Sequence, residues 1–104
     1  MRHDPELSGL YRRNAEALGR SFLDRTDRGA GSTDMGNVSL ALPSIHPAIS
    51  IDSAPVVNHQ PEFTAHCVSP AAEQALLDGS VAMAWTALDA ASDEPLRARL
   101  LAGR

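Results

Sequence analysis

The sequence predicts an α/β fold in which two main helices accompany one or two strands. Segments near both ends of the chain repeat apolar residues at helical spacing, and between them "AISI" alternates apolar and polar residues as a half-buried strand does. One or two strands cannot close a sheet by themselves. We therefore expect an incomplete sheet, in a chain that forms part of a larger domain.

The first predicted helix covers residues 5–22. Asp4 is placed to cap it, and Pro5 suits its first position because the missing proline N–H would have no helical partner there. Apolar residues then recur at steps of three and four and form one stripe: Leu7, Leu10, Tyr11, Leu18 and Phe22.

The middle of the chain, "GAGSTDMGNVSLALPSIHPAIS" from Gly29 to Ser50, joins a glycine-led turn to the most strand-like run of the sequence. Pro43 and Pro47 bracket a short extended piece before "AISI". The following "DSAPVVNHQPEF" contains two prolines, so we expect it to be irregular.

A long helix is predicted from Pro70 to about Ala91, with Ser69 as its cap. Its large apolar residues spread around the helix: Leu76, Leu77, Met83, Trp85 and Leu88. We therefore expect it to pack on more than one side. Because most of the sheet is missing, we also expect the lone chain to expose apolar surface. "DEPLRARLLAGR" adds a short terminal helix.

Composition excludes several classes of function. The chain of 104 residues has a net charge of −4 and carries its arginines near the two ends, which disfavours nucleic-acid binding. The first residues are charged and no run of apolar residues is long enough to span a bilayer, so we expect no membrane association and a cytoplasmic location. The single cysteine, Cys67, cannot form an internal disulfide.

Spacing alone predicts no metal site or nucleophile. The candidate ligands are scattered and form no CxxC, HExxH or HxH pattern: Asp34, His46, Asp52, His59, Glu62, His66 and Cys67. For any one of these histidines, a surface or hydrogen-bonded core role is the commoner outcome. No G-x-S-x-G motif is present, and Cys67 has no motif context, so serine and cysteine hydrolases are disfavoured.

Three motifs in order, "GSTDMGNVS", "PSIHP" and "NHQPEF", resemble the C-terminal part of the M20 metallopeptidase family, in its amidohydrolase and dipeptidase branch. The resemblance implies that residues 1–104 form the C-terminal segment of a catalytic α/β domain, without the lid and dimerisation domain or the N-terminal metal-binding segment. It also implies hydrolysis of an amide bond in a small N-acyl amino acid or dipeptide, with divalent zinc or manganese as cofactor.

The resemblance carries roles onto individual residues. His59 matches a metal ligand of the family, and Glu62 is either the partner that orients it or half of a structural salt bridge. Asp34 orients a ligand, contacts substrate, or caps a helix. His46 forms a pocket wall or substrate contact, or is a hydrogen-bonded residue at a strand edge. Asn37 satisfies backbone groups of the glycine-led turn and shapes the site.

The remaining histidines and the cysteine receive no catalytic role. We expect His66 and Cys67 to pack at the entry of the long helix, and His3 to be inert in a loose terminus. The early H-x-D motif, the bridging acid and the glutamate pair of the family have no counterpart in this sequence. We therefore expect no catalytic residue here, and activity and metal retention only with an upstream catalytic segment or in a homo-oligomer. The alternative is a non-catalytic remnant or interaction module that needs a partner chain.

Overall fold

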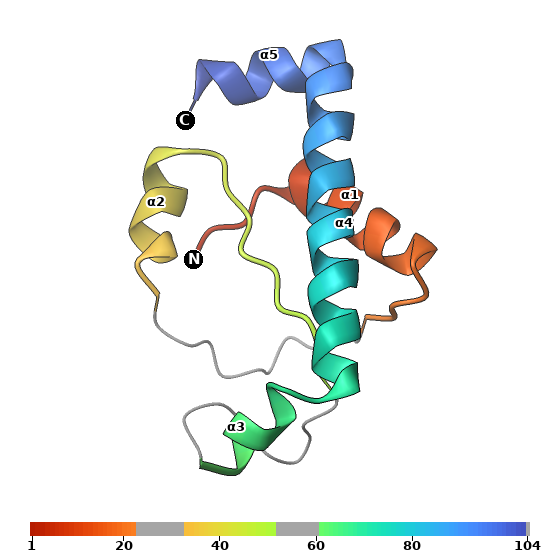
Figure 1. Cartoon of the computed structure of the whole chain (residues 1–104). Helices are drawn as coiled ribbons and strands as arrows, with labels where there is room; N and C mark the ends of the chain where they lie inside the picture. The colour runs from red at the N-terminus through yellow and green to blue at the C-terminus, as the bar shows by residue number, and fades with distance from the viewer. Residues whose placement is uncertain (23–32, 52–60, 104) are drawn as a thin grey trace.

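The computed structural model describes residues 1–22, 33–51 and 61–103, and these ranges contain five helices. They are α1 (Pro5–Ala17), α2 (Met35–Ala41), α3 (Pro61–His66), α4 (Pro70–Ser92) and α5 (Glu94–Ala102). The long helix α4 contacts two other helices: α1 crosses it, and α5 turns away from its C-terminal end (Figure 1).

The predicted α/β class is wrong for the described residues, which contain no strand and no sheet. Their one isolated β-bridge joins His3 to Ser44. Residues 43–51 do leave the helical conformation, but no second strand runs beside them within the described ranges. The alternation in "AISI" indicates a segment with two different faces. A strand also needs a hydrogen-bonded neighbouring strand, which this pattern does not predict. Pro43 and Pro47 also remove two backbone donors from this segment.

Between the predicted glycine-led turn and the predicted strand, Met35–Ala41 form helix α2. A helix pairs its backbone groups within the segment, whereas a strand needs a neighbouring chain. The hydroxyl of Thr33 accepts a hydrogen bond from the backbone N–H of Met35 at the start of α2. Pro43 follows the C-cap residue Leu42, where the helix ends.

Helix α1 begins as predicted and ends earlier than predicted. The carboxylate of Asp4 caps it by accepting hydrogen bonds from the backbone N–H groups of Glu6 and Leu7, each 3.1 Å long. The helix stops at Ala17 because Gly19 adopts a φ of 91°, which favours glycine. The N–H of Arg20 then bonds the carbonyl of Ala15, and that of Gly19 bonds Glu16, closing a Schellman motif.

The core lies where α1 crosses α4. Ala15 and Ala82 are 2% and 0% exposed, so two small side chains allow the helices to approach closely. Tyr11 is buried beside them, and its ring meets the ring of Phe22 edge-on with 6.4 Å between centroids. Partly buried apolar residues complete the cluster: Leu18, Phe22 and Ile45.

Helix α4 has one covered face and one open face among the described residues. Ser69 caps it as predicted, accepting a hydrogen bond from the N–H of Ala72. Its covered face carries small or polar residues: Ala75, Asp78, Ala82 and Thr86. Four large apolar residues are more than half exposed: Leu76, Leu77, Met83 and Leu88. The expected exposed apolar surface is therefore present, and the expected packing of α4 on several sides is not seen within the described ranges.

The predicted terminal helix is confirmed as α5. Asp93 ends α4 and caps α5, because its carboxylate accepts a hydrogen bond from the N–H of Leu96 at 3.0 Å. In the described ranges no helix is long and apolar enough to cross a membrane.

Candidate functional site

Asp34 and Asn37 lie at the start of α2 and are both exposed. Asp34 occupies the N-cap position, yet its side chain makes no capping hydrogen bond, and its backbone is already helical with φ −63° and ψ −18°. A capping residue normally has an extended backbone. Asp34 therefore takes the N-cap position predicted by the helix-cap alternative but does not cap the helix with its side chain, and the residue is exposed.

His46 and Glu62 are also exposed, on two other parts of the chain. His46 lies in the extended segment, which has no strand edge for it to occupy among the described residues. Glu62 lies in the first turn of α3 and forms no ion pair with any described residue. The structural alternatives of a strand-edge histidine and a salt bridge thus find no support, and the predicted roles in a site remain predictions.

The predicted metal ligand His59 lies outside the described residues, as does Asp52. Within the described ranges no three side chains of His, Cys, Asp or Glu lie close enough to hold a metal ion. Asp34, His46 and Glu62 are therefore not gathered into one cluster, and α2 and α3 lie well apart (Figure 1). The described residues alone do not fit a metal centre.

His66 and Cys67 differ in their surroundings. His66 is half-buried at the end of α3, and its carbonyl accepts a 2.7 Å hydrogen bond from the hydroxyl of Ser69. This contact with the backbone of His66 joins the end of α3 to the cap of α4, and the packing role predicted for the His66 side chain remains a prediction. Cys67 is exposed, so the packing role predicted for it is wrong.

A group of charge-assisted hydrogen bonds ties α5 to the start of α1. The guanidinium of Arg99 donates two hydrogen bonds to the carboxylate of Asp4, 2.8 and 2.9 Å long, and a third to Glu6. These bonds hold the pKa of Asp4 below its usual value, against the opposing effect of burial, and raise the pKa of Arg99. The backbone N–H of Asp4 also bonds the carbonyl of Ser44, so one residue connects α1, α5 and the extended segment.

A second polar contact fixes the other end of the extended segment. Arg20 donates through Nε to Asp78 on α4 at 2.9 Å, and through Nη1 to the carbonyl of Ser50 at 3.2 Å. The amide of Gln74 donates a further hydrogen bond to Asp78. Both ends of residues 44–50 are thus held by hydrogen bonds to residues of, or next to, the helices. Asp4 and Asp78 therefore have a structural role.

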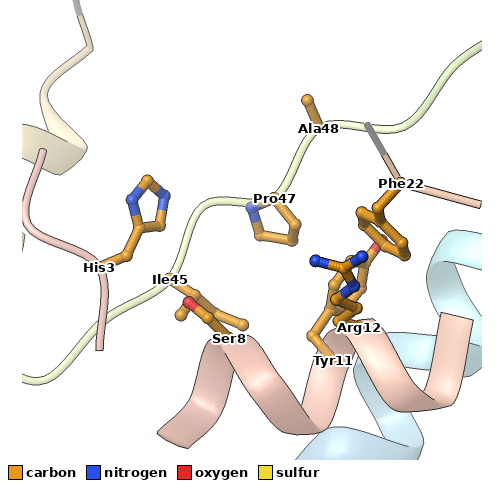
Figure 2. Close-up of a pocket in the computed structure, with 8 residues that line it drawn as sticks. All are labelled: His3, Ser8, Tyr11, Arg12, Phe22, Ile45, Pro47 and Ala48. Carbon is orange, nitrogen blue, oxygen red and sulfur yellow. The ribbon is translucent and has the colours of Figure 1, made fainter. Parts of the chain in front are cut away.

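A cleft of about 280 Å³ opens between α1, the residues around Phe22 and the extended segment. Helix α1 contributes Ser8, Tyr11 and Arg12 on one face, since positions three and four apart lie side by side on a helix. Figure 2 shows His3 at one end of the cleft and Phe22 with Arg12 at the other. The wall opposite α1 comes from the extended segment: Ile45, Pro47 and Ala48.

His3, which is predicted to be inert in a loose terminus, lines this cleft. The bridge between His3 and Ser44 holds the N-terminal residues against the extended segment. No sequence signal marks this pairing, because the two residues lie 41 positions apart and belong to no shared motif. The i, i+4 spacing of Ser8 and Arg12 on the first helix was the only local indication of a shared polar face.

The chain is similar to Xaa-Arg dipeptidases of two mammals. It is 40% identical to the enzyme of Mus musculus over 86 residues, which cover 80% of this chain and 20% of the relative. It is 38% identical to the enzyme of Homo sapiens over 82 residues, which cover 76% of this chain and 19% of the relative. The chain thus spans about a fifth of the length of the curated relatives it matches. No family model and no solved structure matches it.

Proposed function

We propose that this chain is a segment of a dipeptide-hydrolysing enzyme, corresponding to the C-terminal part of its catalytic domain. The similarity to two Xaa-Arg dipeptidases carries the proposal, because it covers more than three quarters of the chain at about 40% identity. The three ordered motifs in the sequence are consistent with it. By analogy with the names of these relatives, the substrate is a small dipeptide whose second residue is arginine.

In this proposal His59 contributes one ligand to a divalent metal, zinc or manganese, and Glu62 three residues later orients the ring. Asp34, Asn37 and His46 border the substrate. One imidazole cannot hold a metal site alone, since such sites converge three or four ligands. The rest of the site is then contributed by another segment, in the same polypeptide or in a second one, and we assign no catalytic step to the described residues.

A second candidate function is an interaction module that acts without catalysis. The open apolar face of α4 favours it, because four large side chains on one helix are more than half exposed. Monomeric proteins rarely leave so many large apolar residues together in water. Both functions predict a partner for α4, and they differ in whether the assembled protein hydrolyses a dipeptide.

The deciding experiment begins with the DNA beside the coding region. A neighbouring frame that encodes the early H-x-D motif and the glutamate pair is co-expressed with this chain, and cleavage of a dipeptide ending in arginine is followed with added zinc or manganese. We expect hydrolysis by the co-expressed pair and loss of at least 100-fold in rate with His59→Ala, since ligand loss removes the metal. His66→Ala is the matched control and retains the activity.

Two outcomes would reject the dipeptidase proposal. One is an assembled pair that is folded and metal-loaded yet leaves the dipeptide intact. The other is hydrolysis that persists unchanged in the His59→Ala variant. Assembly without hydrolysis would favour the interaction module.

A further inference from the structure

The cleft beside α1 has the size and walls of a small-molecule site. Its volume of about 280 Å³ lies close to the lower end of ligand pockets. A cavity of roughly 150 Å³ is enough for one benzene ring, so this cleft has room for a ring with a short side arm. Five of its lining side chains are apolar or aromatic: Tyr11, Phe22, Ile45, Pro47 and Ala48.

The polar side chains of the cleft share one electrostatic preference. His3, Ser8 and Arg12 line it, and among the residues that the structure describes no lining residue carries a carboxylate. An imidazole, a hydroxyl and a guanidinium can all donate hydrogen bonds to an anion. A cation in this cleft would meet the positive charge of Arg12, whereas a carboxylate would be attracted to it.

The guanidinium of Arg12 is positioned by the aromatic ring of Phe22. It lies 5.3 Å from the centroid of that ring, which in turn meets Tyr11 edge-on. Its contact with Glu16 is a long one, 3.6 Å from Nε, between two half-exposed side chains. Such surface pairs contribute little energy. A guanidinium has five N–H donors, so a ligand carboxylate can be added to the partners Arg12 already has.

We propose that this cleft binds a small aromatic carboxylate, with its ring against the Pro47–Ala48 side of the extended segment and its carboxylate on Arg12. The ring buries apolar area against that wall, and the carboxylate gains a charge-assisted hydrogen bond at the open end. The same chemistry occurs in a free aromatic acid and in the C-terminal residue of a peptide ending in phenylalanine. The inference does not depend on dipeptidase activity.

The test is a titration of the ¹⁵N-labelled chain with 3-phenylpropionate, followed by amide chemical shifts. We expect saturable shifts confined to residues 8–12 and 45–48, with a dissociation constant on the order of 1 mM. The uncharged amide of the same acid should bind about five- to tenfold more weakly, since it lacks the charge that Arg12 attracts. An acetylated tripeptide ending in phenylalanine, with and without a C-terminal amide, separates the peptide source from the free acid.

Three variants locate the site. Arg12→Gln should weaken the acid about five- to tenfold and leave binding of the amide unchanged. Ala48→Trp adds bulk to an exposed position on the cleft wall and should abolish binding of both. Arg13→Gln is the matched control: it removes an exposed arginine that does not line the cleft, and it should bind as the unaltered chain does.

Circular dichroism verifies that each variant retains its helices. Equal affinity for the acid and its amide would overturn the electrostatic part of the proposal. Absence of saturable shifts up to about 10 mM ligand, or binding that survives Ala48→Trp, would overturn the site itself.

Discussion

Helices α1 and α4 bury side chains against each other, whereas helices α2 and α3 expose the residues for which a functional role is predicted. The crossing of α1 and α4 buries Ala15 and Ala82, and side chains from distant parts of the chain fix its ends. The short helices α2 and α3 instead display their functional candidates to solvent: Asp34, Asn37 and Glu62. These three residues are thus exposed, as expected of side chains whose partners come from elsewhere.

This contrast separates two kinds of substitution. Changes at the α1–α4 crossing or at its polar attachments should reduce the free energy of unfolding. Changes at the exposed candidate residues of α2 and α3 should leave that free energy almost unchanged and act only on an assembled site.

The largest effect is expected at the centre of the crossing. Ala82→Leu inserts three carbons where the native side chain is fully buried against α1, so we expect a loss of about 3 kcal/mol in the free energy of unfolding. Ala84→Leu makes the same change on an exposed position of the same helix and should alter it by less than about 0.5 kcal/mol. Urea unfolding measured by circular dichroism compares the two. Equal losses would show that the crossing is not the core.

A smaller loss is expected where α5 is attached. Asp4→Ala removes both the cap of α1 and the acceptor for Arg99, so we expect a loss of about 2 kcal/mol. Asp4→Asn keeps a good capping residue and removes the charge, so it should cost about 1 kcal/mol less than Asp4→Ala. The same urea titration measures both variants, and an Asp4→Asn variant as unstable as Asp4→Ala would contradict a separate contribution from the cap.

The contribution of this ion pair should depend on pH in a definite direction. Arg99 holds the pKa of Asp4 in the folded chain below the value of 3.8 that it has without partners. The folded state therefore binds fewer protons, and the stabilisation is complete above pH 3.8 and is lost as the pH falls through the folded pKa. The stability difference between the unaltered chain and Asp4→Asn should be constant from pH 7 to 5 and shrink towards pH 3. A difference that stays constant to pH 3 would contradict the assigned role of Arg99.

The smallest effect is expected on α2. Asp34→Ala and Asn37→Ala replace exposed side chains, and that of Asp34 makes no capping bond, so each should change the free energy of unfolding by less than about 0.5 kcal/mol. If the proposed function is right, the same variants should lower dipeptide hydrolysis in the assembled enzyme. A loss of more than about 1 kcal/mol in the free energy of unfolding, measured by thermal or urea unfolding, would instead show that these side chains stabilise the fold.

Local signals explain which elements could be predicted from the sequence. Asp4 with Pro5, and Ser69 with Pro70, mark helix starts through capping chemistry that needs only neighbouring residues. The extended segment could not be assigned in this way, because alternation in "AISI" says nothing about a neighbouring strand. Met35–Ala41 could form helix α2 because a helix needs no hydrogen-bonded partner outside itself.

The predicted metal site and the cleft beside α1 also differ in whether a sequence pattern indicates them. Motif resemblance predicts roles in a site for Asp34, Asn37, His46, His59 and Glu62, and these roles remain predictions. The described residues gather no three metal ligands. The cleft had no motif at all. It depends on the bridge between His3 and Ser44 and on Arg12 stacking over Phe22, which are contacts between segments that no local pattern encodes.

The central claim is that this chain carries part of a metal-dependent site and needs another segment to complete it. Calorimetric titration of the isolated chain with zinc at pH 7 tests that claim most directly. We predict no tight stoichiometric uptake, since His59 alone cannot supply the three or four ligands that zinc requires. Uptake of one zinc per chain with a dissociation constant below about 1 μM, abolished by His59→Ala and retained by His66→Ala, would contradict it.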